Sequence, residues 1–382
     1  MEKQMNFKKL LYNRRLWIAL IGFIFCALII TRSDIFSYYG DIFSIQRGLV
    51  LNVDNSLLSP DPSIENLYLG RQIIEVEILT GEFVGQRFRI ENTLSRFFNY
   101  VAQENMEMIF HINVVDGQVF LIHVFGHSRD GFIFGFIGFF ALILIIVGKQ
   151  KGLYSLLALM FTLSVVAFFM IPLIIEGHNP IVAAIITAVL TTVFSILLVS
   201  DVSLQSAAAI GGTVAGVAIA GAIGLIAGRF AHISGMHMQH AQELIVQQGM
   251  DGVIRLPLLL FAGIIIASLG AVMDVGVTIA SSVFEMKRVN PSLSIGQLYK
   301  SGMNIGRDII GTMSNTLILA FAGSSITVMV IIALYQLPYI RFINLDMLAV
   351  EVIQGLSASI GLVLVVPITA FFAAFLAAGK SI

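Results

Sequence analysis

After Phe132 the sequence consists largely of uninterrupted apolar segments, each long enough to cross a lipid bilayer. A membrane-spanning helix needs about 20 predominantly apolar residues to cover roughly 30 Å of hydrocarbon. Segments of this kind lie at 132–148, 153–175, 180–199, 206–228, 256–284, 308–334 and 351–377. Their apolar residues are continuous rather than alternating, which indicates helices and not the strands of a membrane barrel. The chain is therefore expected to be a polytopic α-helical membrane protein.

The composition excludes several other classes of protein. Only 12% of the residues are charged, against roughly 25% in an ordinary soluble domain, and the mean hydropathy is +0.92. The net charge of −1 and the lack of a basic run give no attraction for nucleic acid. The chain has one cysteine, Cys26, so neither an intrachain disulfide nor a cysteine-based metal site is expected.

The N-terminus combines basic residues with a first apolar run, Leu16–Ile30. This pattern fits either a cleaved signal peptide or an uncleaved anchor. No Ala-x-Ala-like cleavage site follows the run, which favours an anchor whose basic end stays in the cytoplasm. Residues 1–31 are thus expected to form a cytoplasmic N-terminus and a signal-anchor helix, which brings the expected number of spanning helices to about eight. The basic residues are Lys3, Lys8, Lys9, Arg14 and Arg15.

Residues 32–130 differ from the rest of the chain in being more polar and in showing strand-like patterns. Strands are predicted at 73–78, 82–90 and 119–125, and a short helix is predicted within 93–105. About 100 residues suffice for one small domain. The segment is expected to form a β-barrel-like or sandwich domain between the first and second helices.

The basic residues outside the apolar segments set the expected orientation. With alternating spans, most of them fall on the side of the basic N-terminus, as the positive-inside rule requires. Both termini are therefore expected in the cytoplasm, at the two ends of a chain whose seven-helix membrane domain is 131–382. The β-rich domain is expected to be extracytoplasmic. The residues on the inner side are Lys149, Lys151, Lys287, Arg288, Lys300, Arg307 and Lys380, against Arg229, Arg255 and Arg341 on the outer side.

A small residue recurs at every fourth position of the segment 206–228: Gly212, Gly216, Ala220, Gly224 and Gly228. Such a stripe lets another helix backbone approach closely. Three interpretations remain open: tight packing inside one subunit, an oligomer interface, and a helix that slides during a conformational cycle.

Asp274 is a carboxylate inside the apolar segment 256–284, roughly 15 Å of helix from the charged residues that begin at Glu285. Insertion scales give about 2.5–3.5 kcal/mol for such a residue at a helix centre, so it is expected to face the protein interior, be paired or be protonated. Gly270, Thr278 and Ser281 share its face. This stripe is either part of an ion or substrate path or a structural hydrogen-bond anchor.

A second polar stripe lies between residues 302 and 315, where Asn304, Asp308, Gly311 and Asn315 fall on one helix face. Arg307 lies beside that face and can pair with a carboxylate or bind an anion. The sequence leads to the hypothesis that five residues form one polar cluster in the cytoplasmic half of the membrane: Asp274, Asn304, Arg307, Asp308 and Asn315.

Other polar residues lead to further predictions. Glu351 is expected to cap or border the last helix, and Pro367 is expected to kink it. A loop after 228 carries three histidines and an acid that could form a metal-binding edge, but a solvated or interfacial loop is favoured. No metal site, cofactor or catalytic arrangement is predicted, and no P-loop is present, so an enzyme is not expected. The loop residues are His232, His237, His240 and Glu243.

Several segments resemble the YibE/F-like family of bacterial multispanning membrane proteins. They are 269–275 (Leu-Gly-Ala-Val-Met-Asp-Val), 301–320, which contains Gly-Met-Asn-Ile-Gly-Arg-Asp, and 361–370, while 76–83 resembles the N-terminal β-domain of the family. The resemblance implies a longer, YibE-type member in the bacterial cell membrane with a shorter YibF-type membrane partner. The histidine-containing loop departs from the family pattern. The resemblance implies no particular substrate.

Two functions are compatible with these patterns. The first is a secondary transporter or exporter of an ion or small charged solute, in which Asp274, Thr278, Asn304, Arg307, Asp308 and Asn315 bind the ion or solute. The second is a non-transporting scaffold or assembly subunit that works with a YibF-type partner or as a homo-oligomer in the lipid bilayer.

Overall fold

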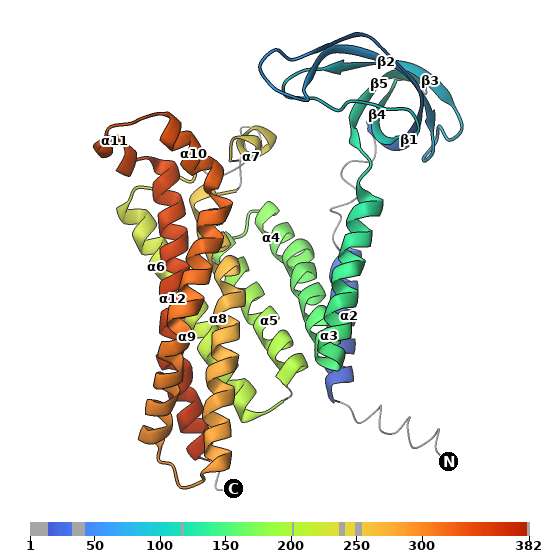
Figure 1. Cartoon of the computed structure of the whole chain (residues 1–382). Helices are drawn as coiled ribbons and strands as arrows, with labels where there is room; N and C mark the ends of the chain where they lie inside the picture. Colours follow the sequence, from blue (N-terminus) through green and yellow to red (C-terminus); the bar gives the residue numbers. More distant parts are fainter. Residues whose placement is uncertain are drawn as a thin grey trace, which may run out of the picture. The chain divides into compact units, whose positions relative to one another are not determined.

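The computed structural model of the chain describes residues 14–32, 43–115, 118–200, 202–236, 241–248 and 254–379. It divides into two compact units, Asp34–Ile146 and Met1–Ser33 with Val147–Ile382 (Figure 1). The first unit holds the β-sheet and the second holds most of the helices.

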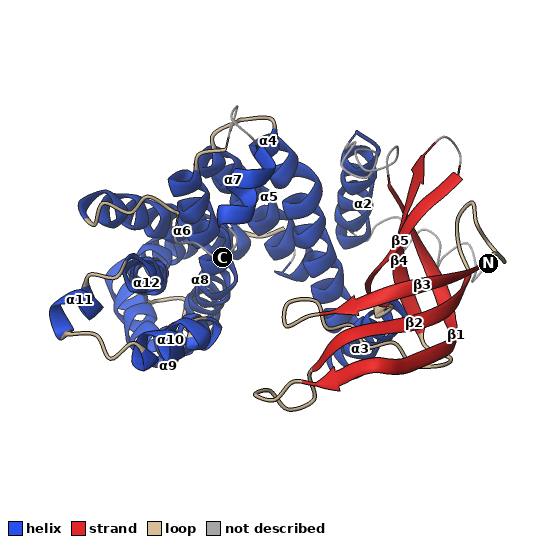
Figure 2. Cartoon of the chain, turned by 90° about the horizontal axis from the view of Figure 1, so that it is seen from above, coloured by secondary structure: helices blue, strands red, loops and turns tan. Residues whose placement is uncertain are grey.

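The β unit contains five antiparallel strands in the order β3-β2-β1-β4-β5. The edge strands β3 and β5 also contact each other, so the sheet curls into a barrel-like form (Figure 2). The predicted β-rich domain is therefore confirmed. The strands are β1 (Phe43–Pro60), β2 (Tyr68–Ile78), β3 (Arg87–Leu94), β4 (Glu107–Val115) and β5 (Gln118–His127).

Alternating residues of these strands form the core of the β unit. Val76 lies opposite Val50 on the neighbouring strand, and both are fully buried. Phe110 is the largest fully buried side chain and lies on the same inner face as Met108 and Ile112. Because side chains alternate between the faces of a strand, burying one face leaves polar residues such as Glu75 and Arg71 outside.

A buried amide pair links β2 and β3 to the segment that follows β3. Gln72 and Asn92 are cross-strand neighbours, and Asn92 Nδ2 donates to Gln72 Oε1 at 3.0 Å. Gln72 Oε1 also accepts from the Ala102 N–H at 2.9 Å, and its Nε2 donates to Ala102 O at 3.1 Å and to Asn55 Oδ1 at 2.6 Å. Asn92 Nδ2 in addition donates to Tyr100 O at 2.9 Å. These bonds fix the segment 99–105 against the sheet.

The predicted helix within 93–105 is wrong, because this segment forms turns instead. The Ser95 N–H donates to Phe98 O at 2.8 Å, and Ser95 Oγ accepts from the Phe98 N–H at 3.1 Å. Asn99 Nδ2 donates to Ser95 O at 3.0 Å and also to Tyr68 O. Ser and Asn side chains that bond nearby backbone in this way compete with helix formation.

An ion pair between the buried Asp61 carboxylate and the half-exposed Arg96 guanidinium fixes the same turn to the loop between β1 and β2. Asp61 accepts from Arg96 Nε at 2.6 Å, from Arg96 Nη2 at 3.1 Å and from the N–H of Ser63 at 2.8 Å. The Arg96 guanidinium and the Ser63 amide lower the pKa of Asp61. Its stabilising contribution is therefore present above the pKa of the unfolded chain and is lost as the pH falls through the lowered folded value.

The helical elements range in length from the five residues of α4 to the 36 residues of α3. They are α2 (Arg14–Arg32), α3 (Asp130–Val165), a π-helical turn (Val166–Met170), α4 (Ile171–Ile175), α5 (Pro180–Ser200), α6 (Leu204–Phe230), α7 (Ala241–Gln248), α8 (Leu256–Val289), α9 (Ile295–Ser324), α10 (Ile326–Leu334), α11 (Tyr339–Ile343) and α12 (Asp346–Ala378).

The long helices confirm a multispanning membrane-embedded protein. In the described part of the chain five helical stretches are long and apolar enough to cross a bilayer, or up to six when α9 and α10, bent by 59°, count as one span. The predicted number of eight is not confirmed. Helix α3 has a non-helical backbone at Lys149 (φ 51°, ψ −130°), between the segments predicted at 132–148 and 153–175. The predicted anchor contains a shorter apolar helix, Trp17–Leu28.

Helices α6, α8 and α12 pack on one another, and α9 and α5 flank them (Figures 1 and 2). Their shared core is built from small and branched apolar side chains, including Ala358, Leu362, Val365 and Val272, all fully buried. The small residues allow the helix backbones to approach closely, and dispersion contacts at this density stabilise the bundle.

The predicted apolar segment 308–334 covers only part of its helices, because α9 begins at Ile295. Ser294 Oγ accepts from the Gln297 N–H, and Gln297 Oε1 accepts from the Ser294 N–H, which is a complete capping box. The helix ends at Ser324, and the chain bends before α10. Hydropathy located the apolar part of this helix but not its polar first turns.

Candidate functional site

Asp274 and Thr278 lie on the face of α8 that the rest of the bundle does not cover. Both residues are exposed, whereas Val272 and Gly276 on the opposite side are buried against α6 and α12. Thr278 Oγ1 donates to the backbone oxygen of Asp274 at 2.8 Å, and this bond leaves the carboxylate oxygens open. Asp274 therefore does not face the interior of its own bundle, which was the first of the three alternatives expected for it.

Ser281, the third polar residue of the predicted stripe on α8, has a partner within the bundle. Gln205 Nε2 of α6 donates to Ser281 Oγ at 2.8 Å. This contact ties the start of α6 to α8, so Ser281 is engaged in holding two helices together.

The polar residues of α9 also lie on an uncovered face. Asn304, Arg307, Asp308 and Asn315 are all exposed, and the buried residues of this helix, Leu298, Gly302, Gly306 and Leu317, lie on its other side. Arg307 Nη1 donates to Asn304 Oδ1 at 3.2 Å.

Asp274 and Arg307 lie at similar depths in the bundle. Helix α8 ends at Val289 and the neighbouring α9 begins at Ile295. At a rise of 1.5 Å per residue, Asp274 is about 22 Å of helix from the first point and Arg307 about 18 Å from the second. Among the described residues no hydrogen bond or ion pair joins Asp274 to Arg307 or Asp308. The two helices therefore present charges at one level, and the five-residue cluster stays a prediction.

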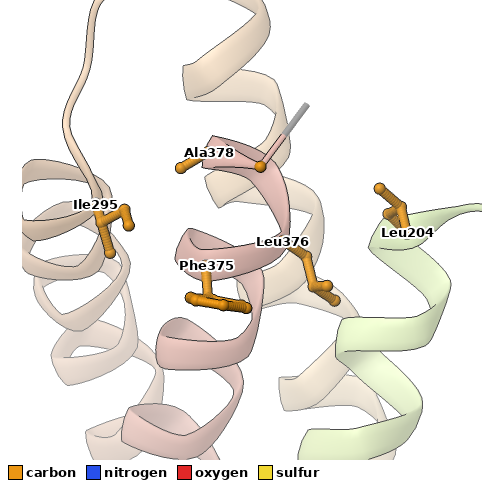
Figure 3. A pocket seen from close by; sticks show the side chains of 6 residues that line it. Leu204, Ile295, Phe375, Leu376 and Ala378 are labelled. Atoms are coloured by element: carbon orange, nitrogen blue, oxygen red, sulfur yellow. The ribbon is translucent and has the colours of Figure 1, made fainter. Parts of the chain in front are cut away.

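Two pockets of the bundle are apolar and do not include the predicted polar residues. One, of about 350 Å³, lies among the ends of α6, α9 and α12 (Figure 3) and is lined by Leu204, Ile295, Phe375, Leu376, Ala378 and Gly379. The other, of about 330 Å³, is lined by Tyr299, Pro367, Ile368 and Phe371. The polar residues lie instead on open helix faces.

The predicted glycine stripe of α6 packs within the chain. A Cβ added at Gly212 would overlap Thr369 of α12, and one at Gly228 would overlap Phe261 of α8. At Gly216 it would lie 2.9 Å from Val272 Cγ1, and at Gly224 it would lie 2.9 Å from Ile264 Cδ1. Of the three interpretations of this stripe, the structure favours tight packing inside one subunit.

Glu351 does not begin the last helix, since α12 starts at Asp346. Ser325, which is buried at the bend between α9 and α10, donates from Oγ to Glu351 Oε2. The bend is thereby tied to α12, a role that the sequence did not reveal. Pro367 lies inside α12, which continues as a helix to Ala378.

The histidine-containing loop is described only in part. His232 has a left-handed backbone (φ 52°) and Glu243 lies on α7, whereas His237 and His240 lie outside the described residues. Within the described ranges no group of three or more His, Cys, Asp or Glu side chains is placed to hold a metal ion.

Comparison with known proteins gives a match to a protein family. A family model described as YibE/F-like protein matches residues 136–379, more than half of the chain, from α3 to the end of α12. Neither the curated proteins nor the solved structures that were compared give a match.

Proposed function

The chain belongs to the YibE/F-like family, and on that premise we propose that it is a secondary transporter or exporter of an ion or a small charged solute. One observation carries the proposal: Asp274 lies well inside the apolar helix α8, and Arg307 and Asp308 lie at similar depth on α9, at the start of its apolar part. Ionisable side chains inside a membrane are costly and usually mark an ion or substrate path.

The residues divide into two groups by chemistry. Asp274 and Thr278 offer carboxylate and hydroxyl oxygens, which suit a proton or a hard cation. Arg307 offers a fork of donors that suits a carboxylate or phosphate group, and Asn304 orients it. Coupling one ion to one solute needs two such sites, and no covalent step is involved.

The proposed setting is the bacterial cell membrane, with both termini in the cytoplasm and the β unit outside. The supporting observation is the excess of basic residues on one side of the spans, including Lys287, Arg288 and Lys300.

Flux in proteoliposomes tests the proposal. Purified full-length protein is reconstituted, a proton or sodium gradient is imposed, and internal pH is followed with a panel of anions and cations outside. Asp274→Asn is expected to lower the gradient-driven signal roughly 10-fold or more, because an amide neither carries a proton nor pairs with a cation. Glu285→Gln, a carboxylate change at the exposed end of the same helix, is the matched control and should retain flux. Absence of flux from the unaltered protein, or full flux from Asp274→Asn, would refute transport at this site.

A scaffold function is the second candidate, and one feature of the β unit favours it. Phe97 is 94% exposed and Phe98 is 67% exposed, yet both lie on a turn held by Ser95 and Asn99 and by the Asp61–Arg96 ion pair. Large apolar side chains on a rigid, exposed turn are typical of a protein contact.

The two candidates differ in which residues a stable partner requires. If the chain is a scaffold, the double variant Phe97→Ser/Phe98→Ser should no longer copurify with an envelope protein. Asp274→Asn should leave that protein bound. Quantitative mass spectrometry of the affinity-purified full chain measures this. An unchanged set of copurifying proteins in the double variant would contradict the scaffold function.

A further inference from the structure

We propose that a second copy of this chain covers the open faces of α8 and α9, so that the membrane unit is a two-fold symmetric dimer. We call this surface the α8–α9 polar face. The inference uses residues of the proposed path but not their activity, so a dimer can be found whether or not transport is. The face is made of Gly263, Ala267, Gly270, Asp274 and Thr278 on α8 and Asn304, Arg307, Asp308, Gly311 and Asn315 on α9, all exposed.

The first observation is that small residues on this face have open space over them. A Cβ built on Gly263, Gly270 or Gly311 would have no heavy atom within 4 Å among its described neighbours. Glycines on the inward faces of the same helices differ, since a Cβ would lie 2.6 Å from Thr213 Oγ1 at Gly276 and 2.8 Å from Val283 Cγ2 at Gly302. Small residues at membrane helix surfaces let a further helix approach closely. Within the unit that contains the bundle, the described residues supply no such helix at this face.

The second observation is that the face is charged where lipid would otherwise contact it. Exposed positions on other helices of the bundle are apolar at Val182 and Ile186 of α5 and at Leu356 and Ile360 of α12. Hydrocarbon offers no hydrogen bonds to a carboxylate or guanidinium, so charged residues in spanning helices turn to protein or water. A lipid-facing position suits the α5 and α12 surfaces but not Asp274, Arg307 and Asp308.

The third observation identifies the occupant by charge. The face carries both signs, with Asp274 and Asp308 negative and Arg307 positive. Two copies inserted in the same direction are related by an axis along the membrane normal, so residues meet at equal depth. Asp274 and Arg307 are about 22 and 18 Å from the same end of the bundle. Pairing the face with itself therefore brings Arg307 of one protomer to Asp274 of its partner, and the reverse.

Disulfide crosslinking between two tagged chains tests the dimer. Cys26→Ser removes the single cysteine of the chain. One tagged copy then carries Gly270→Cys and a second copy, with a different tag, carries Gly311→Cys. These two glycines have free space above them and lie at similar depth, about 28 and 24 Å from the same end. Because each chain holds one cysteine, a product bearing both tags arises only between two copies.

A two-tag product is expected after mild oxidation of intact membranes. The matched pair Val182→Cys and Leu356→Cys, which lie on the apolar exposed surfaces of α5 and α12, should not give it. Arg307→Asp introduced into both tagged copies should abolish the product, and combining it with Asp274→Arg in both should restore it. Equal crosslinking by the α5/α12 pair, a lack of product from the Gly270/Gly311 pair, or a product joining one tag to another protein would overturn the homodimer. None of these readouts depends on flux, so their failure is distinguishable from failure of the proposed transport.

Discussion

Replacing Gly212 by alanine is expected to disturb the packing of α6 on α12 and to lower the stability of the folded protein by a large margin. The added Cβ would overlap Thr369 Oγ1 and would lie 2.8 Å from Thr369 Cβ and 3.1 Å from Thr369 Cα. A change of rotamer can move the hydroxyl but not the Cα, so the two helices must separate. Overpacking of this kind typically costs about 1–3 kcal/mol and sometimes more, which is a large share of a stability of roughly 5–15 kcal/mol.

The neighbouring residue supplies the matched control for this prediction. A Cβ at Gly211 would make only ordinary contacts, 3.5 Å from Phe372 Cδ2 and Cε2, and alanine favours a helix over glycine by up to about 1 kcal/mol. Gly211→Ala should therefore remain folded. The measurement is the fraction of monodisperse protein left after heating in detergent. Gly212→Ala combined with Thr369→Gly should recover part of the loss. Equal thermal stability of the two single variants would contradict the prediction.

This stripe shows what the sequence can reveal about helix packing. The four-residue spacing from Gly212 to Gly228 was enough to predict that another backbone approaches this face. The identity of that backbone was not readable, because α8 and α12 are distant in the sequence and spacing along one helix carries no information about its neighbours. In the structure the glycines contact Thr369 of α12 and Val272 and Phe261 of α8, so these two helices are the partners.

The start of α9 was readable in principle but was missed. Ser294 and Gln297 have the spacing of a capping box, and the structure shows both of its hydrogen bonds. Hydropathy instead placed the segment at 308, because the first turns of α9 carry polar residues such as Gln297, Lys300 and Asn304. An apolar window locates the part of a helix that can lie in lipid, whereas capping residues locate its end.

The strands were harder to predict for a physical reason. β1 was missed, because its register shifts between Val50 and Asn52 and again between Asp54 and Leu57 interrupt the alternation of buried and exposed residues. β4 was also missed, because apolar residues such as Ile109 and Phe110 occur on both of its faces. The region 82–86, predicted as the start of a strand, forms a turn before β3.

The residues of the predicted polar cluster lie on two helix faces, and both faces are exposed. The helical repeat alone places Asp274 and Thr278 on one face of α8, and Asn304 and Asp308 on one face of α9. Which face the bundle buries depends on the packing of α8 and α9 against α6 and α12, and this left the polar sides uncovered. The sequence shows that a carboxylate in an apolar helix needs a polar neighbour. It does not show whether that neighbour lies in the same bundle or on a surface outside it.

Replacing Gln72 by leucine is expected to destabilise the β unit strongly although the volume of the side chain is nearly kept. Gln72 is fully buried and accepts from the Ala102 N–H while donating to Ala102 O and Asn55 Oδ1. Leucine leaves both backbone groups of Ala102 without these partners, and each buried polar group left unpaired costs about 1–3 kcal/mol. The expected loss is a few kcal/mol, together with release of the segment 99–105 that follows Phe97 and Phe98.

Hydrogen exchange of the full-length protein in detergent measures both effects. The amide of Ala102 should exchange much faster in Gln72→Leu, because its hydrogen bond to Oε1 is gone and the segment separates from β2 and β3. Gln86→Leu is the matched control, since Gln86 is exposed and contributes its backbone, not its side chain, to the bonds with Ile78 and Phe83. If Ala102 exchanges equally slowly in both variants, the amide pair does not hold this segment. If it exchanges faster only in Gln72→Leu, the segment 99–105 that follows Phe97 and Phe98 is held by a hydrogen-bond network in the core and not by the exposed turn alone.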